Sequence, residues 1–324
     1  MGITVEQAQT MAPEDMDEGA VRAEFQSVVD SDGRTLTAIA NEVGIAYSTL
    51  AAWRAGKYAG DNAKVTAAAR AWLTRRVARS RATMVLPANP GFVMTKTAGE
   101  IIDVLEAAQS LGRMAVVVGA PGTGKTMAFR QYRRTYPQVV WIATMQPCHT
   151  TSSAVLREIA VTLGLPQEHA AADISRSITR RLLDTQGLLI IDEAQHLPPN
   201  ALDQVRSIHD VAEIGVVLGG NAGLMTKLGA IQRMPDLAQI FSRIALRYDR
   251  KRVLKADATA LLDAWGVEHD GARTELLGIA MKPGGARVMV HVLTQAFVMA
   301  SAVGDQGVAL KHVQDAHSQL AGAA

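Results

Sequence analysis

The chain has 324 residues, of which 48% are hydrophobic and 20% are charged, and its formal net charge is +2 at pH 7. This balance is ordinary for a globular protein of two or three domains and excludes a chain that is disordered throughout. A single cysteine, Cys148, excludes an internal disulfide. The start of the chain carries the acidic run 14–18 in place of a signal pattern, and no apolar run approaches the length of a membrane span. We therefore expect a cytoplasmic protein without a membrane partner.

The first 95 residues divide into three parts by their sequence pattern. Residues 1–19 predict a flexible tail, since they carry acids, Gly and Pro without a sustained period. Residues 20–82 predict a compact helical domain that contains a helix-turn-helix, with Gly44 in the turn and the small Ala40 where the two helices cross. Residues 83–95 contain prolines and a Pro-Gly pair, and they predict a linker.

The outer face of the second helix in this motif carries hydroxyls and one guanidinium, groups suited to phosphates and base edges. An arginine run without acids follows further along the chain. The candidate DNA-binding residues of this domain are Tyr47, Ser48, Thr49, Arg54, Arg75, Arg76 and Arg79. A helical bundle that binds no DNA is the alternative, because the core pattern specifies the turn and not a ligand.

Residues 96–255 alternate short apolar runs with helix-like segments, a pattern typical of a parallel sheet covered by helices. The expected strands are 114–118, 139–143, 188–191, 215–219 and 244–248. After about residue 255 the strand-like runs end, and residues 256–324 predict a small all-helical domain. The expected fold class is therefore α/β with helical domains on both sides in the sequence.

Directly behind the first expected strand, residues 119–126 read Gly-Ala-Pro-Gly-Thr-Gly-Lys-Thr, the spacing G-x-x-x-x-G-K-[ST]. Glycines at this spacing let backbone N–H groups surround phosphate oxygens, and the following helix adds the positive end of its dipole. We expect Lys125 to reach the β- and γ-phosphates of ATP and Thr126 to bind Mg²⁺. The predicted nucleotide-binding residues here are Gly119, Pro121, Gly122, Thr123, Gly124, Lys125 and Thr126. A turn that binds nothing has no need of Lys-Thr after its last glycine.

The run 188–191 delivers two acids, Asp192 and Glu193, at its carboxyl end. We expect Asp192 to hold Mg²⁺ through water and Glu193 to polarise the water that attacks the phosphate, as a general base does. A solvated strand end is the alternative, and the presence of the phosphate loop in the same chain argues against it.

Three more residues are candidates for the same site. Asn221 follows run 215–219, where its amide is placed to bridge the γ-phosphate and the attacking water, although an Asn at a strand end is more often a helix cap. Arg243 precedes the last expected strand, a position suited to an arginine finger that acts on a neighbouring subunit. Arg287 begins a helix of the C-terminal domain and is placed to touch the γ-phosphate. A salt bridge or a DNA phosphate is the alternative partner for each arginine.

The order of the phosphate loop, Asp192-Glu193, Asn221, Arg243 and Arg287 resembles the AAA+ ATPase family. That resemblance implies a P-loop AAA+ core with a parallel sheet at 96–255 and an all-helical lid at 256–324. A narrower resemblance is to the MuB-like transposition proteins B of Mu-like phages, and it covers about residues 20–320. The stretches that carry it are Lys57–Asn62, Arg130–Arg134, Thr185–Glu193, Phe241–Ile244 and Lys282–Gly284.

The narrower resemblance implies an ATPase that uses ATP and Mg²⁺ in a bacterial host cell. It also implies self-assembly into a helical oligomer on double-stranded DNA with little sequence preference, and delivery of that DNA to a DDE transposase with stimulation of strand transfer. The C-terminal domain is mildly acidic, so the arginines of the core are the stronger DNA-binding candidates: Arg130, Arg133, Arg134, Arg176, Arg180 and Arg181. A helicase-loader ATPase and a helix-turn-helix regulator with a nucleotide switch are the alternatives.

Overall fold

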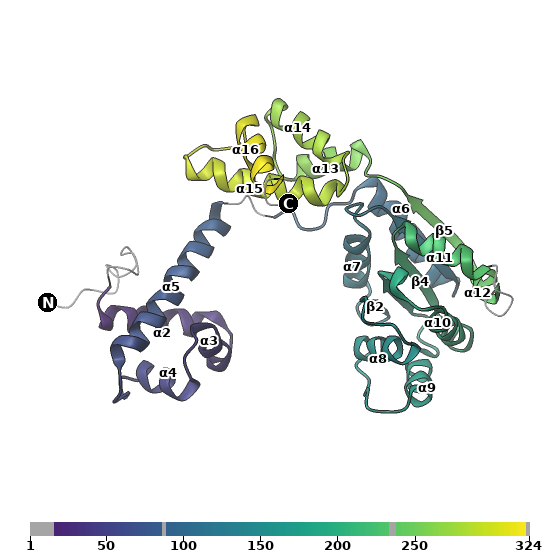
Figure 1. Ribbon diagram of the computed structural model, residues 1–324, viewed down its shortest axis with the longest axis horizontal. Coiled ribbons are helices and arrows are strands. Elements are labelled where there is room, and N and C mark those ends of the chain that lie inside the picture. Colours follow the sequence, from purple (N-terminus) through teal and green to yellow (C-terminus); the bar gives the residue numbers. More distant parts are fainter. Residues whose placement is uncertain (1–15, 86–88, 233–237, 322–324) are drawn as a thin grey trace. The chain divides into compact units, whose positions relative to one another are not determined.

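The computed structural model describes residues 16–85, 89–232 and 238–321 (Figure 1). The chain divides into two compact units, Met1–Leu86 and Pro87–Ala324, and each has hydrophobic clusters of its own. Residues 1–15 of the predicted tail lie outside the described residues. Met16 is buried and the first described helix begins at Glu18, so the packed part of the chain starts inside the segment predicted as a tail.

Helices make up the described part of the first unit: α2 (Glu18–Asp32), α3 (Leu36–Val43), α4 (Tyr47–Arg54) and α5 (Asn62–Val85). Gly44 has a left-handed conformation with φ of 79° and ends α3 by donating a backbone hydrogen bond to Ala40. The chain then turns directly into α4. The two helices and their glycine turn lie where the sequence predicts them, while a DNA-binding role for this motif stays a prediction.

Aromatic side chains pack at the centre of this unit. The ring centroid of Phe25 lies 5.7 Å from that of Trp53 and 5.3 Å from that of Trp72. Trp53 also donates an indole hydrogen bond of 3.1 Å to the buried hydroxyl of Thr66 on α5. Helix α5 continues to Val85 and therefore enters the predicted linker 83–95, because residues 82–85 contain neither Gly nor Pro to end it.

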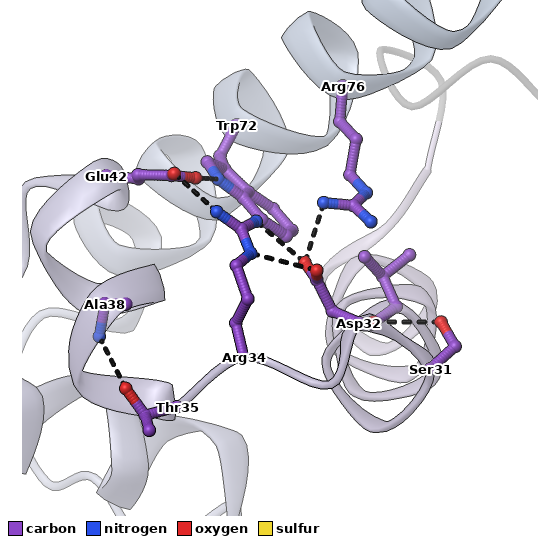
Figure 2. Close-up of polar contacts among 9 residues, drawn as sticks. Ser31, Asp32, Arg34, Thr35, Ala38, Glu42, Trp72 and Arg76 are labelled. Atoms are coloured by element: carbon purple, nitrogen blue, oxygen red, sulfur yellow. Dashed lines mark hydrogen bonds and ion pairs between the residues drawn. The ribbon is translucent and has the colours of Figure 1, made fainter. Parts of the chain in front are cut away.

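A network of charged side chains joins α2, α3 and α5 (Figure 2). Arg34 donates hydrogen bonds of 2.9 and 2.8 Å to the two oxygens of Asp32 and one of 2.6 Å to Glu42. The indole of Trp72 donates to the other oxygen of Glu42 at 3.1 Å, and Arg76 donates to Asp32 at 2.7 Å. Each carboxylate therefore bonds both to Arg34 in the loop between α2 and α3 and to a side chain of α5, which links the three helices.

Because of this network, we expect the stability of the first unit to fall at low pH. Hydrogen bonds from Arg34 hold the pKa of Asp32 below its ordinary value, and hydrogen bonds from Trp72 and Arg34 do the same for Glu42. A depressed folded-state pKa contributes stability that is present above the ordinary values, here 3.8 and 4.5, and is lost as the pH falls through the folded values. We expect the protection factors of backbone amides in α3 to fall over that range.

Hydrogen exchange followed by mass spectrometry measures these protection factors in the full chain, separately for each unit. The control is the double variant Asp32→Asn, Glu42→Gln, which should be less protected at neutral pH and should show a flatter acid dependence in α3. An equally steep loss of protection in that variant would contradict the assignment of the acid response to the network.

The second unit is built on a parallel sheet (Figure 1). Its strands are β1 (Met114–Gly119), β2 (Val140–Thr144), β3 (Leu188–Asp192), β4 (Gly215–Gly220) and β5 (Ile244–Arg250). Their order in the sheet is β2-β3-β4-β1-β5, and every neighbouring pair is parallel. All residues of β1, β3 and β4 are buried, which explains why their sequence is continuously apolar apart from Asp192 at the end of β3. The parallel sheet expected from the alternating pattern is confirmed.

Helices cover both faces of this sheet. Side chains alternate along a strand, so Val116 and Val117 of β1 point to opposite faces. The face of Val117 is covered by α6 (Lys96–Ser110) and α7 (Lys125–Thr135). The face of Val116 is covered by α8 (Ser152–Thr162), α9 (Ala171–Leu182), α10 (Pro199–Ala212) and α11 (Ala222–Gln232). A short helix, α12 (Ala238–Arg243), leads into β5.

The C-terminal part of this unit is helical, as predicted: α13 (Lys255–Ala264), α14 (Asp270–Ala280), α15 (Gly285–Ala302) and α16 (Leu310–Ala321). These helices share a core of their own, in which Trp265 stacks on Phe297 with ring centroids 6.1 Å apart. Buried Asp257 of α13 accepts hydrogen bonds from the hydroxyl of Thr97 at 2.5 Å and from its backbone N–H at 3.2 Å. These hydrogen bonds link α13, the first helix of the C-terminal part, to the start of α6.

The carboxyl ends of parallel strands meet at one edge of the sheet. Strands β1, β4 and β3 lie side by side and end at Gly119, Gly220 and Asp192. The segments that follow these strands therefore lie together, whereas Arg243, which precedes β5, lies at the opposite edge. Among the helices of the described ranges, none is both long and apolar enough to cross a membrane.

Candidate functional site

The loop between β1 and α7 turns through two left-handed glycines. Gly122 and Gly124 have φ of 80° and 90°, values at which a side chain would be strained. The hydroxyl of Thr123 donates a hydrogen bond of 2.8 Å to the carbonyl of Ala120, which fixes the loop from inside. Helix α7 begins at Lys125, so its first N–H groups have no partner within the helix and its positive dipole end faces the loop. This is the geometry that holds a phosphate group.

Lys125 lies folded back over this loop. Its ammonium donates hydrogen bonds of 2.7 Å to the carbonyl of Gly119 and 3.2 Å to that of Ala120. Burial lowers the pKa of Lys125, the charges of Asp192 and Glu193 act in the opposite direction, and the charge of Arg287 lowers it further. The structure therefore brings these predicted site residues within electrostatic reach of one another. An anion bound beside Lys125 would relieve its repulsion from Arg287.

Thr126 and Asp192 are in direct contact across the edge of the sheet. The Thr126 hydroxyl donates a hydrogen bond of 2.7 Å to Asp192 Oδ2, although 66 positions separate the two residues. Asp192 is 2% exposed, and burial raises its pKa despite hydrogen bonds from Thr126 and from the backbone N–H of Glu193. Two converging oxygen ligands of this kind suit Mg²⁺, whose charge would stabilise the ionised carboxylate. The residues present therefore fit the metal and the nucleotide that the sequence predicts.

Glu193 follows Asp192 in a left-handed conformation with φ of 56°. Its side chain accepts a hydrogen bond from the amide of Gln195, which lies in a short 3₁₀ turn, η2 (Ala194–His196). Sequence reasoning names Glu193 but not Gln195. The signal was present in the run Asp-Glu-Ala-Gln, yet the contact depends on the turn that the backbone makes after Glu193.

Asn221 follows β4, which lies between β1 and β3, so it stands between the phosphate loop and Asp192 along the edge. Its side-chain oxygen accepts a hydrogen bond of 2.8 Å from the backbone N–H of Gly223 and thereby begins α11. This is the helix cap that the sequence offers as the alternative reading. The γ-phosphate contact of Asn221 stays a prediction.

The first turn of α15 lies directly against the phosphate loop. A Cβ placed on Gly122 would stand 2.1 Å from the carbonyl oxygen of Gly284 and 3.2 Å from the backbone nitrogen of Arg287. Only a glycine at position 122 permits this approach. Arg287 is exposed on that turn. The first turn of the helical C-terminal part therefore lies at the loop, while its role as a lid and a contact of Arg287 with the γ-phosphate stay predictions.

A hollow opens beside the loop, between the segment that leads into α6 and the lid. It is lined by Phe92, Val93, Thr95, Ala98, Gly122, Thr123, Gly124, Met127, Val253, Asp257, Leu261 and Ala286. Most of these side chains are apolar, and they come from the approach to α6, from the loop and from the lid. Apolar walls beside a phosphate loop are the kind of surface that suits a flat, apolar group attached to the phosphate. Sequence reasoning does not find it, because its walls come from distant parts of the chain.

Arg243 lies apart from these residues. Ile244 pairs with Met114, the first residue of β1, whereas the loop begins after its last residue, about 16 Å away at roughly 3.3 Å per residue. The guanidinium of Arg243 donates hydrogen bonds of 2.8 and 3.4 Å to Asp210, and the side chain is 47% exposed. Arg243 therefore does not reach the loop of its own chain.

The core arginines predicted to bind DNA lie on the outward faces of two helices. Buried apolar side chains occupy the inward faces of α7 and α9. The exposed residues are Arg130, Arg133 and Arg134 on α7 and Arg176, Arg180 and Arg181 on α9. Arg176 pairs with Asp173, and the guanidinium of Arg181 lies 5.4 Å from the ring centroid of Trp141. Because α7 and α9 cover opposite faces of the sheet, these arginines form two groups.

The candidate DNA-binding residues of the first unit differ in solvent exposure. The exposed ones are Tyr47, Ser48 and Arg75, and the partly buried ones are Thr49, Arg54 and Arg76. Arg76 is paired with Asp32 and lies over the ring of Trp72 at 5.4 Å, so it has a structural role within its unit. The side chain of Arg79 is not among the side chains that the structure describes. DNA contact by any of these residues stays a prediction.

A phosphate loop, an acidic strand end beside it and a helical lid, on a parallel sheet of this order, define an AAA+ P-loop protein. Comparison with known proteins agrees with this class. The family model described as "AAA domain" matches residues 108–228, and the one described as "Mu B transposition protein, C terminal" matches residues 242–320.

Curated relatives extend over nearly the whole chain. The ATP-dependent target DNA activator B of Escherichia phage Mu is 36% identical over 287 residues, which are 88% of this chain and 90% of that protein. The Mu-like prophage FluMu DNA transposition protein B of Haemophilus influenzae is 34% identical and covers 81% of this chain and 90% of its own. The chain therefore belongs to the family of Mu B transposition proteins.

Solved structures show the same fold at low sequence identity. The Aeropyrum pernix ORC1 protein in complex with DNA superimposes with a TM-score of 0.54 at 19% identity, covering 74% of this chain and 69% of that one. The Drosophila ORC bound to DNA gives a TM-score of 0.54 at 17% identity, with 74% of this chain and 65% of that chain covered. These likenesses concern the fold alone.

Proposed function

We propose that this protein is a Mg²⁺-dependent ATPase that assembles with itself on target DNA and supplies that DNA to a DDE transposase in a bacterial host cell. The observation that carries the ATPase is the contact of Thr126 with Asp192 beside Lys125 and Glu193. A hydroxyl, two carboxylates and an ammonium meet at a helix N-terminus, and this combination suits the binding and cleavage of a nucleoside triphosphate.

Each group at this edge has one chemical task in the proposed reaction. The loop N–H groups and Lys125 bind the phosphates, Thr126 and Asp192 hold Mg²⁺, and the apolar hollow takes the base. The bound metal supplies charge that stabilises the phosphate oxygens as the bond to the leaving group breaks. Glu193 orients a water molecule and accepts its proton. Asn221 and Arg287 contact the γ-phosphate from β4 and from the lid.

The position of Arg243 supports the proposed self-assembly. This arginine is exposed at the edge opposite its own loop, so the phosphate that it contacts belongs to a neighbouring copy. The same edge carries a groove lined by Arg243, Asp210 and Tyr136, among others. Leu111, an exposed apolar side chain, lies in it. A head-to-tail contact of this type repeats from copy to copy and yields a helical oligomer when it does not close.

DNA binding is proposed to be electrostatic and largely independent of sequence. The arginines on α7 and α9 point outward without forming a base-reading surface, and α4 offers mainly hydroxyls. The relatives named as target DNA activator and DNA transposition protein support target DNA as the ligand and strand transfer as the stimulated step.

A salt series with random duplexes tests this proposal. In ATP, we expect log affinity to fall linearly with log salt, with a slope of about −0.9 for each phosphate neutralised, and to vary little among sequences. The double variant Arg133→Ala, Arg134→Ala should reduce the magnitude of the slope by about two, since each lost phosphate contact reduces it by about one. Lys311→Ala, an exposed cation of the lid, is the control and should leave the slope unchanged.

Two outcomes would contradict the DNA-binding proposal. One is a shallow slope together with a single preferred operator, which would favour a helix-turn-helix regulator. The other is equal affinity in ATP and ADP, because we propose that Arg243 contacts the γ-phosphate of a neighbouring copy and that assembly on DNA depends on this contact.

A further inference from the structure

Gln195 occupies a central position at the edge of the sheet that carries the nucleotide site. It lies in the 3₁₀ turn η2, two residues beyond Glu193, and it is partly buried. Both polar atoms of its side-chain amide form hydrogen bonds. Nε2 donates to Glu193 Oε2, and Oε1 accepts from the backbone N–H of Asn221 at 3.4 Å. One side chain thus links the predicted general base with the predicted γ-phosphate contact.

The glycine at the end of β4 leaves room for this amide. A Cβ placed on Gly220 would stand 2.7 Å from Gln195 Oε1 and 3.0 Å from Leu224. The glycine at the end of β4 therefore permits the close approach of the amide to the strand. A larger residue there would push Gln195 away from Asn221.

Lys227 of α11 fixes the turn from the other side. Its ammonium donates hydrogen bonds to the carbonyl of Gln195 and, at 2.8 Å, to that of Leu197. Burial lowers the pKa of Lys227. Helix α11 begins at the cap formed by Asn221, so this one helix holds η2 both at its first turn and at Lys227. Glu193, Gln195, Asn221 and α11 therefore form one connected unit.

We propose that Gln195 is a positioning residue for ATP hydrolysis, which holds the Glu193 carboxylate and the Asn221 backbone in one hydrogen-bonded unit. This inference rests on the hydrolysis proposed above. The chemistry explains the residue type: an amide N–H restrains a carboxylate oxygen without neutralising its charge, whereas Lys or Arg would pair with that charge. The Glu193 carboxylate keeps its second oxygen for the attacking water.

Steady-state hydrolysis and equilibrium ATP binding of the full chain test the proposal. Gln195→Ala should lower kcat by up to about 10²-fold, because a general base that is misplaced by a small distance loses most of its effect. The Kd for ATP and the KM should stay unchanged, since Gln195 contacts neither the loop nor the lid. Gln195→Glu should lose more, because it brings a second carboxylate against Glu193. The control is Gln232→Ala, at the exposed end of α11, which should behave as wild type.

A double-mutant comparison separates positioning from a merely structural role. In the Glu193→Gln background, adding Gln195→Ala should cause no further loss of kcat, because the general base that it positions is already gone and Asn221 is still held by its hydrogen bond from Gly223. A structural role would instead lower kcat in both backgrounds and would weaken ATP binding.

Three results would overturn the inference while leaving the ATPase intact. They are an unchanged or raised kcat in Gln195→Ala, a loss that is additive with Glu193→Gln, and a parallel rise in the Kd for ATP. Absence of hydrolysis by the wild-type protein with DNA and Mg²⁺ would overturn the proposed function and this inference with it.

Discussion

Replacement of Arg243 by alanine should lower the rate of ATP hydrolysis by about 10³-fold or more, the range of arginine fingers that act between subunits, and should leave the affinity for ATP unchanged. The reason is geometric. Arg243 lies at the edge of the sheet opposite its own phosphate loop, so its contribution to hydrolysis comes only in an assembly. The fold should survive, because Asp210 keeps its 2.6 Å contact with Arg206 when Arg243 is removed.

Hydrolysis assays across a range of protein concentrations, with light scattering to follow assembly, measure this effect. Arg247→Ala is the matched control. Arg247 is an exposed arginine of β5 whose guanidinium lies 4.2 Å from the ring centroid of Phe241. Full ATPase activity in an Arg243→Ala protein, or in any variant that stays monomeric, would show that the finger assignment is wrong.

The second large effect is expected from Glu193→Gln. Removal of the general base should slow hydrolysis by about 10² to 10⁴-fold, while ATP binding persists because Lys125, Thr126 and Asp192 are untouched. We propose that release from DNA requires hydrolysis, so this variant should remain on DNA in ATP far longer than wild type. The acid supplies a chemical step and not a binding contact.

Dissociation of labelled duplex in excess ATP measures that retention. Glu168→Gln, an exposed glutamate away from the site, should dissociate at the wild-type rate. The same assay with Lys125→Ala should show little DNA binding at all, because this variant loses the phosphate contact that precedes assembly. Release of Glu193→Gln at the wild-type rate would separate hydrolysis from DNA release and contradict the proposal.

Much of this fold could be predicted from local sequence because its elements carry strong local signals. Apart from Asp192 at the end of β3, the residues of β1, β3 and β4 are continuously apolar, as is typical of strands buried on both faces. Residues 119–126 indicate their turn by spacing alone. Gly44 likewise marks the turn after α3. These local signals therefore predict the fold class, while the family is indicated by the stretches that resemble it.

Other features depend on which segments meet in space, and the sequence pattern does not contain that information. The role of Gln195 follows from the position of β4 between β1 and β3, which places Asn221 within reach of η2. The apolar hollow combines residues near 92 with residues near 257. Arg76 reads as one more cation of a basic run, yet its partner Asp32 lies 44 positions earlier.

The central claim is that ATP bound by one copy is hydrolysed with the help of Arg243 from the next copy on DNA. Mixing two inactive proteins, Arg243→Ala and Glu193→Gln, tests it most directly. The Arg243→Ala protein keeps Glu193 and the rest of its nucleotide site, and the Glu193→Gln protein keeps Arg243. In a mixed oligomer, some junctions therefore combine an intact nucleotide site from one copy with Arg243 from the next. With random incorporation of equal amounts, ATP hydrolysis in the presence of DNA should recover to about a quarter of the wild-type rate per protein, because a head-to-tail contact needs one intact half from each neighbour. A mixture that stays as inactive as its two components would contradict the account.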